Sequence, residues 1–157
     1  DRPAPFFVFG DDIEYSLRRA RGTLSMSGIA VWHESFQNKK NPITHNYLTV
    51  RNGLIINLLH GYDRHHSLLL VLARYGWQCA RGNRHEGALI GTALSHALQG
   101  PEALRSDVNP YKELRRLRLP DAPGRLIRDI MALTTTYGQL RKRFRESLHP
   151  VCRGEHA

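Results

Sequence analysis

The sequence is poor in cysteine, in acidic residues and in long apolar runs. Its two cysteines, Cys79 and Cys152, stand far apart and lack metal-binding spacing. We interpret them as free thiols of a reducing compartment, with a single disulfide as the open alternative. No apolar run approaches the roughly 18–20 residues of a membrane span, and no internal repeat or low-complexity tract is present. These absences argue against a membrane-spanning chain and against a repeat protein.

The shortage of acidic residues leaves the chain strongly basic. Lysine and arginine number 23 against 14 aspartates and glutamates, which gives a net charge of +9 and a pI of about 10.2. This balance favours polyanionic partners such as nucleic acid, anionic lipid or a nucleotide diphosphate. With 157 residues, 41% of them hydrophobic and 24% charged, the composition is typical of one globular domain with a sizeable core.

The acidic residues that are present cluster near the start of the chain. Asp11, Asp12 and Glu14 follow an apolar run, Phe6–Phe9, and Gly10. We predict a short strand, a sharp turn at Gly10 and then a helix from about Ile13, with Asp11 or Asp12 as its N-cap. Capping needs only one aspartate, and a second adjacent carboxylate is costly unless it serves a metal or a proton transfer. A carboxylate in this position can act as a general base.

A second pattern follows about twenty residues later. Residues 22–32 alternate small or polar side chains with apolar ones, which predicts two short strands or one extended segment broken at Gly28. The segment ends at Trp32, His33 and Glu34. A lone histidine at a strand end is more often a hydrogen-bonded structural residue, although neutral imidazole also binds manganese and zinc. From spacing alone, the site is incomplete.

Three blocks together resemble a known family. Phe7–Arg18, Gly28–Glu34 and Tyr47–Asn52 are similar, in order and spacing, to the second half of a bacterial inverting glycosyltransferase of the GT-A fold, in the large family 2-like group. The subgroup they resemble is the galactofuranosyltransferase-like enzymes of cell-wall and surface-polysaccharide synthesis. The resemblance covers about residues 5–55, a third of the chain.

The resemblance implies roles by position. Asp12 matches the catalytic base that deprotonates the acceptor hydroxyl, and His33 matches the histidine of a divalent-metal site, for Mn2+ or Mg2+. Such a metal neutralises the charge that develops on the diphosphate leaving group. The other matching positions are expected on the acceptor side: Asp11, Glu14, Trp32, Tyr47, Arg51 and Asn52. For the last three, a structural role or phosphate contact is also open.

The chain departs from this family at its beginning. Only five residues precede Phe6, whereas the family needs an upstream nucleotide-binding region that ends in an Asp-x-Asp-type metal motif. We therefore expect an α-rich α+β fragment of a longer or split enzyme that is inactive alone. Residues 1–44 would be the C-terminal piece of the GT-A (α/β) catalytic domain, and 45–157 a helical C-terminal region.

Helical spacing of apolar residues dominates that second region. It predicts helices over residues 45–62, 65–81, 84–98 and 125–148. Histidines His60, His65 and His66 invite a metal interpretation, but surface histidines around a helical turn are commoner. The basic end of the last helix, Arg141–Arg145, is first a solvated face, second a membrane-surface patch and third a nucleic-acid site.

Two classes of function follow. The first is the acceptor-side part of a metal-dependent glycosyltransferase, with a nucleotide-diphosphate sugar donor and a glycan or lipid-linked glycan acceptor. It would be cytoplasmic, with peripheral contact at the inner face of the membrane left open and no nucleic acid expected. The second is a stand-alone basic helical module for nucleic acid or anionic membrane. A metal hydrolase built on Asp11, Asp12 and His33 is a weaker third class, because further ligands are not evident.

Overall fold

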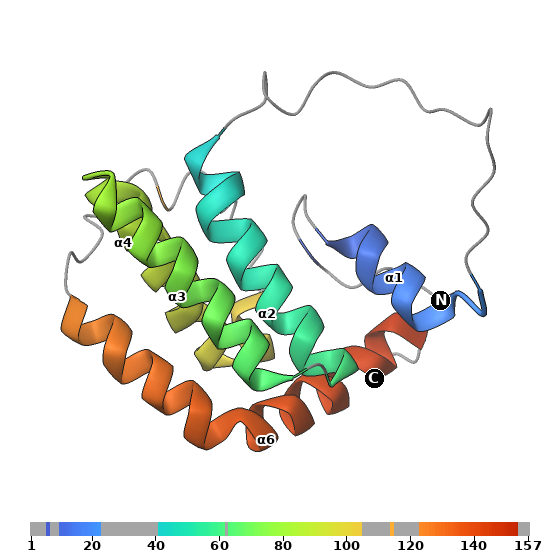
Figure 1. The fold of residues 1–157 in the computed structure, drawn as a ribbon. Helices are drawn as coiled ribbons and strands as arrows, with labels where there is room; N and C mark the ends of the chain where they lie inside the picture. The colour runs from blue at the N-terminus through green and yellow to red at the C-terminus, as the bar shows by residue number, and fades with distance from the viewer. Residues whose placement is uncertain are drawn as a thin grey trace, which may run out of the picture.

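The structure is a computed structural model that describes Phe6 and residues 10–22, 41–61, 63–104, 114 and 123–153. Within these residues all regular elements are helices (Figure 1). They are α1 (Asp11–Arg19), the π-helical segment η1 (Ile43–Leu48), α2 (Thr49–His60), α3 (Arg64–Ala80), α4 (Arg84–Gln99), the 3-10 turn η2 (Pro101–Leu104) and α6 (Pro123–Arg153).

The expected α+β fragment of a GT-A domain is wrong. The described residues form helices and no strand. Phe6 and Gly22 lie outside any strand, and the rest of the two segments expected to be extended falls outside the described residues. The physical reason is that apolar side chains recur at helical spacing from residue 43 to residue 148, so helix faces bury one another without a sheet. The domain boundary at residue 44 stays a prediction.

The four longer helices predicted from the sequence are confirmed, with ends that differ by a few residues. Helix α4 is central, because it packs against η1, α2, α3 and α6. Its inward residues are fully buried: Leu89, Ile90, Ala93, Leu94 and Ala97. The two alanines in this set let neighbouring helices approach closely, and together with the buried faces of η1, α2 and α6 they form one continuous core.

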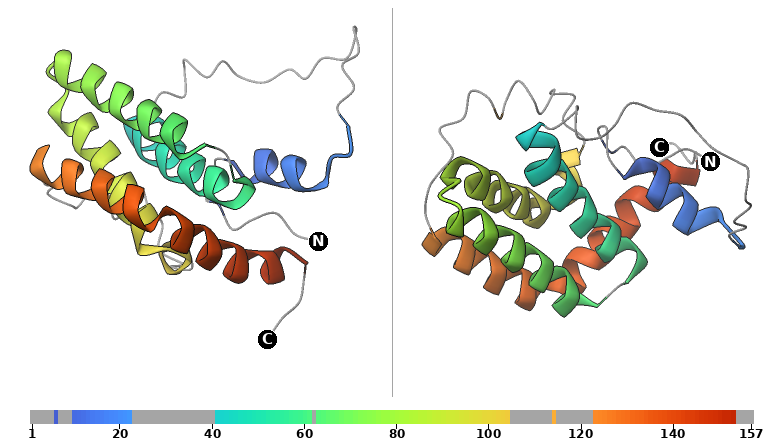
Figure 2. Two further views of the ribbon diagram at one scale, coloured as in Figure 1. Left: turned by 60° about the horizontal axis from the view of Figure 1, so that its bottom comes forward. Right: turned by 45° about the horizontal axis from the view of Figure 1, so that its top comes forward.

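Helix α6 runs along one side of the bundle, and the views in Figure 2 show the same arrangement. Its buried stripe consists of Leu126, Leu133, Leu140, Phe144 and Leu148. The first three are seven residues apart, which is two helical turns and keeps them on one face. This stripe packs against α2 and α4. None of the described helices has the length and apolar character to cross a membrane.

The basic end of α6 meets the carboxyl ends of two other helices. Arg145 Nε donates a hydrogen bond to the carbonyl of Leu59 at 3.0 Å, near the end of α2. Arg143 donates to the carbonyl of Gln99 at 3.4 Å and pairs with Glu102 at 3.0 Å. Cations at helix C-termini satisfy exposed carbonyls and the negative end of the helix dipole. At least these two arginines therefore have a structural role.

Candidate functional site

The acidic cluster lies in the first turn of α1. The helix begins at Asp11, two residues earlier than predicted, and its N-cap is Gly10 with φ 95° rather than an aspartate. Asp12 Oδ1 accepts a hydrogen bond from the backbone N–H of Ile13 at 2.8 Å. Because Gly10 occupies the capping position, neither aspartate is committed to capping the helix.

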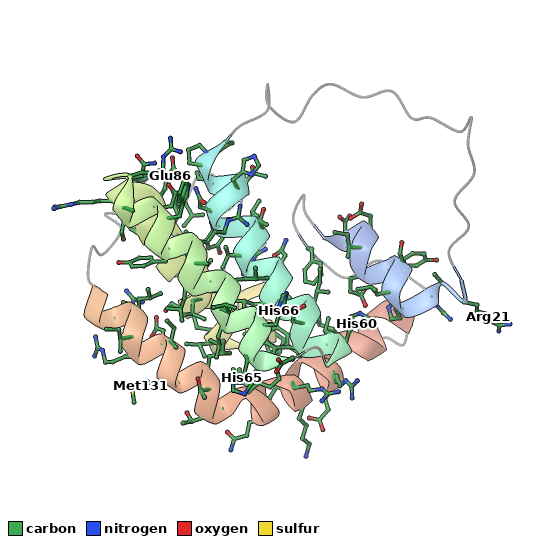
Figure 3. The ribbon with its side chains drawn as sticks, in the orientation of Figure 1. Arg21, His60, His65, His66, Glu86 and Met131 are labelled. Carbon is green, nitrogen blue, oxygen red and sulfur yellow. The ribbon has the colours of Figure 1, made fainter. Side chains whose placement is uncertain are left out.

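The three carboxylates occupy different environments. Asp12 is exposed, Asp11 is half-buried, and Glu14 is 2% exposed. Glu14 Oε1 lies 3.1 Å from Arg18 Nε and 3.5 Å from His60 Nε2, an ion pair in the second case only when the imidazole is protonated. Figure 3 shows His60 at the end of α2 that faces α1. Glu14 therefore connects α1 to α2, whereas Asp12 is accessible to a reactant.

Helix α1 does not turn its apolar residues inward. Ile13 and Leu17 are 45% and 43% exposed, while Glu14 faces α2. The close approach occurs at Gly10, where a Cβ atom would lie 3.0 Å from Ile56 Cδ1 and 3.6 Å from Asn52 Cβ. The contact between α1 and α2 thus depends on a glycine and a buried carboxylate. It also places Gly10, the residue before the acidic cluster, next to Asn52.

The Tyr47, Arg51 and Asn52 block forms a buried polar network. The three residues are 3%, 6% and 0% exposed. Arg51 donates from Nε to Asn52 Oδ1 at 2.9 Å and from Nη1 to the Tyr47 hydroxyl at 3.3 Å, and its guanidinium lies over the Tyr47 ring at 5.3 Å. The Tyr47 hydroxyl also lies 2.7 Å from His96 Nδ1. This network ties η1 and α2 to α4, which gives the block a structural role.

The structure brings together part of the predicted site. Gly10, which precedes the acidic cluster, packs against Asn52, and Asn52 accepts a hydrogen bond from Arg51. Trp32 and His33 lie outside the described residues, so their roles stay predictions. Within the described part of the chain, no group of three histidine, cysteine, aspartate or glutamate side chains could hold a metal ion.

Two histidines have partners that the sequence does not indicate: His60 meets Glu14, and His96 joins the Tyr47 network. The sequence predicts a surface position for His60, as for His65 and His66, yet the His60 side chain is 19% exposed and lies 3.5 Å from Glu14. His96 contacts Tyr47 across 49 positions of sequence. The one sequence signal for His96 is its place beside the apolar stripe of α4, and no local pattern identifies its partner.

Comparison with known proteins gives one partial likeness. The chain is similar to the galactofuranosyltransferase GlfT2 of Mycobacterium tuberculosis, with 33% identity over 63 residues. That stretch spans 38% of this chain and 10% of the relative. No family model matches the chain, and no solved structure matches it. The likeness relates part of this chain to a glycosyltransferase.

Proposed function

We propose that this chain is the acceptor-side portion of an inverting glycosyltransferase. It would take a sugar from a nucleotide-diphosphate donor and act on a glycan or lipid-linked glycan acceptor of a bacterial surface. The observation that carries the proposal is the likeness to a galactofuranosyltransferase, together with an exposed carboxylate, Asp12, in the first turn of a helix.

The proposed step is proton removal from the acceptor hydroxyl. Asp12 accepts this proton while the hydroxyl oxygen attacks the anomeric carbon and the diphosphate departs. A general base must reach the acceptor hydroxyl, directly or through one water. The exposure of Asp12 supports this role, whereas buried Glu14, held by Arg18, suits the positioning of α1.

A divalent ion, Mn2+ or Mg2+, is proposed for the complete enzyme, with His33 among its ligands. The described residues do not form such a site by themselves. When bound, the ion would stabilise the leaving diphosphate. The activity is proposed for a longer enzyme or for this chain with a partner that supplies the donor site.

Substitution of Asp12 in the complete enzyme tests the assignment. Asp12→Asn should lower kcat by about 100-fold or more, the range expected for loss of a general base. The control is Asp63→Asn, because Asp63 caps α3 by accepting a hydrogen bond from the N–H of His65 and asparagine caps equally well. Transfer is measured from a nucleotide-diphosphate galactofuranose donor to a galactofuranose oligosaccharide. Near-normal turnover of a folded Asp12→Asn enzyme would sink the base assignment.

The alternative of a basic binding module lacks a specific observation in its favour. Two of the clustered cations, Arg143 and Arg145, contact helix carbonyls, and Lys142 lies 3.8 Å from Glu146. Binding of nucleic acid with a steep salt dependence would nevertheless bring that alternative to the front.

A further inference from the structure

A pocket with both apolar and polar side chains in its wall lies away from the acidic cluster. It has a volume of about 370 Å³ and is formed where the residues that lead into η1 meet the last turns of α3 and the start of α4. Its lining includes Asn46, Trp77, Gln78 and Glu86. Figure 3 shows Glu86 at the opposite end of the bundle from His60. Asn46 and His60 are separated along η1 and α2 by about 20 Å of helix, at about 1.5 Å per residue.

The polar side chains of this pocket hold one another in place. Asn46 is 3% exposed and donates to Glu86 Oε2 at 2.8 Å. Gln78 donates to Asn46 Oδ1 at 3.4 Å and accepts from Asn83 Nδ2 at 3.0 Å. These planar groups therefore have fixed orientations. No described residue donates a hydrogen bond to Glu86 Oε1, and a carboxylate accepts up to about four bonds, so Glu86 retains capacity for a ligand.

An exposed tryptophan forms part of the wall. Trp77 is 61% exposed, although tryptophan is normally largely buried. Arg81, one turn later on the chain, has its guanidinium 5.5 Å from the centroid of the Trp77 ring. This contact restrains the indole, and most of the side chain remains accessible. An aromatic face is electron-rich, and it attracts the weakly positive C–H groups on the face of a sugar ring.

The mixture of groups selects the chemistry of the ligand. An apolar ligand would remove water from Glu86 and Gln78 without replacing their hydrogen bonds, which is unfavourable. An anion would meet the Glu86 carboxylate, and a simple cation would meet Arg74, which also lines the pocket. A neutral polyhydroxylated ligand can donate to Glu86, accept from Arg74 and stack on Trp77. A glycan has this combination of properties.

We propose that the pocket bounded by Trp77, Gln78 and Glu86 is a glycan-binding subsite. The pocket would hold a distal part of the acceptor polymer, and this assignment rests on the proposed function. The prediction that the pocket binds a glycan does not rest on it. Its separation from the α1 end of the bundle suits a polymer that reaches across the helices. Binding energy from such a remote contact would favour longer acceptors over short ones.

Direct binding tests the subsite on this chain, independently of transfer. A galactofuranose oligosaccharide is titrated by calorimetry, and the indole N–H signal of Trp77 is followed by NMR, with its assignment taken from the signal missing in Trp77→Phe. We expect saturable binding that shifts this signal. Trp77→Ala should weaken Kd by about tenfold, or 1.4 kcal/mol, and Trp77→Phe, which keeps an aromatic face, should weaken it less.

The matched control is Leu69→Ala, because Leu69 lies on the same helix and is 64% exposed without lining the pocket. It should leave Kd unchanged. An absence of binding, or binding of equal strength in Trp77→Ala with an intact circular dichroism spectrum, would overturn the subsite. A second variant, Glu86→Gln, keeps an acceptor for Asn46 but removes the charge, and it should also weaken binding, since charge-assisted hydrogen bonds are stronger.

Transfer assays on the complete enzyme separate the two proposals. If the pocket holds distal acceptor units, Trp77→Ala raises KM for a long galactofuranose acceptor and leaves kcat and the KM for a disaccharide unchanged. Equal effects on both acceptors would overturn the distal assignment. A complete enzyme without transferase activity would sink the proposed function, while the calorimetric result would still decide whether the pocket binds glycans.

Discussion

Replacement of Gly10 by alanine should loosen the contact between α1 and the bundle. Gly10 has φ 95°, a conformation that costs a residue with a Cβ atom about 1–3 kcal/mol. The new methyl group would also lie 3.0 Å from Ile56 Cδ1, so the Ile56 side chain must shift by a few tenths of an ångström. Reduced freedom of the unfolded chain offsets about 0.4–1 kcal/mol of this cost. The net expectation is a loss of about 1–2 kcal/mol of unfolding free energy.

Replacement of a second glycine, Gly76, provides a control in which the unfolding free energy should change in the opposite direction. Gly76 lies inside α3, is exposed, and has open space where a Cβ atom would be placed. Because glycine in a helix interior is less favourable than alanine by about 0.5–1 kcal/mol, Gly76→Ala should stabilise the protein. The two variants make the same chemical change, so a general effect of alanine cannot explain opposite results.

Urea unfolding followed by circular dichroism at several protein concentrations measures both effects. With a slope of about 1–3 kcal/mol per molar urea, the midpoint should fall by several tenths of a molar or more for Gly10→Ala and rise by a smaller amount for Gly76→Ala. If Gly10→Ala unfolds at or above the wild-type midpoint, the assigned backbone conformation and packing of Gly10 are wrong. A lower midpoint for Gly76→Ala as well would mean that the control has failed and that alanine itself is unfavourable.

Two further predictions concern tyrosine hydroxyls. Tyr47→Phe removes the hydroxyl that meets His96 Nδ1 and Arg51 Nη1, so the unfolding free energy should fall by about 1–3 kcal/mol. The control Tyr15→Phe, at an exposed ring, should change it by less than about 0.5 kcal/mol. Equal changes in the two variants would contradict the Tyr47 network. Burial raises the pKa of Tyr137 above its ordinary value of 10.0, so the folded state keeps a proton that the unfolded state has lost. Stability should therefore be unaffected below about pH 10 and fall as the pH rises through the folded pKa. Tyr137→Phe should reduce this alkaline loss, and identical slopes in wild type and variant would refute the assignment.

Local pattern was sufficient for the helices but not for the fold class. The apolar residues of α4 and α6 recur at helical spacing, and both helices lie near their predicted positions. The expectation of an α+β fragment rests on resemblance and on an alternating segment, and it is wrong because the described core is formed almost entirely by helices, with no strand among the described residues. Spacing along one helix fixes which face is apolar, but it does not state what covers that face.

The orientation of α1 also could not be predicted from the spacing of its apolar residues. Sequence periodicity places Ile13 and Leu17 on one apolar face, yet both are exposed, and Glu14 meets α2 instead. A buried carboxylate is tolerated there because Arg18 and His60 approach it. Since His60 is distant in sequence, the orientation of the helix could not be obtained from its own residues.

The sequence by itself determined the basic character, the main helices and the grouping of Asp11, Asp12 and Glu14. These features depend on composition and on neighbours within a few positions. Only the tertiary structure separated exposed Asp12 from buried Glu14, joined Tyr47 to His96 and placed Trp77 beside Glu86. Each of these results requires two segments to meet in space, and such meetings are decided by how whole helix faces pack.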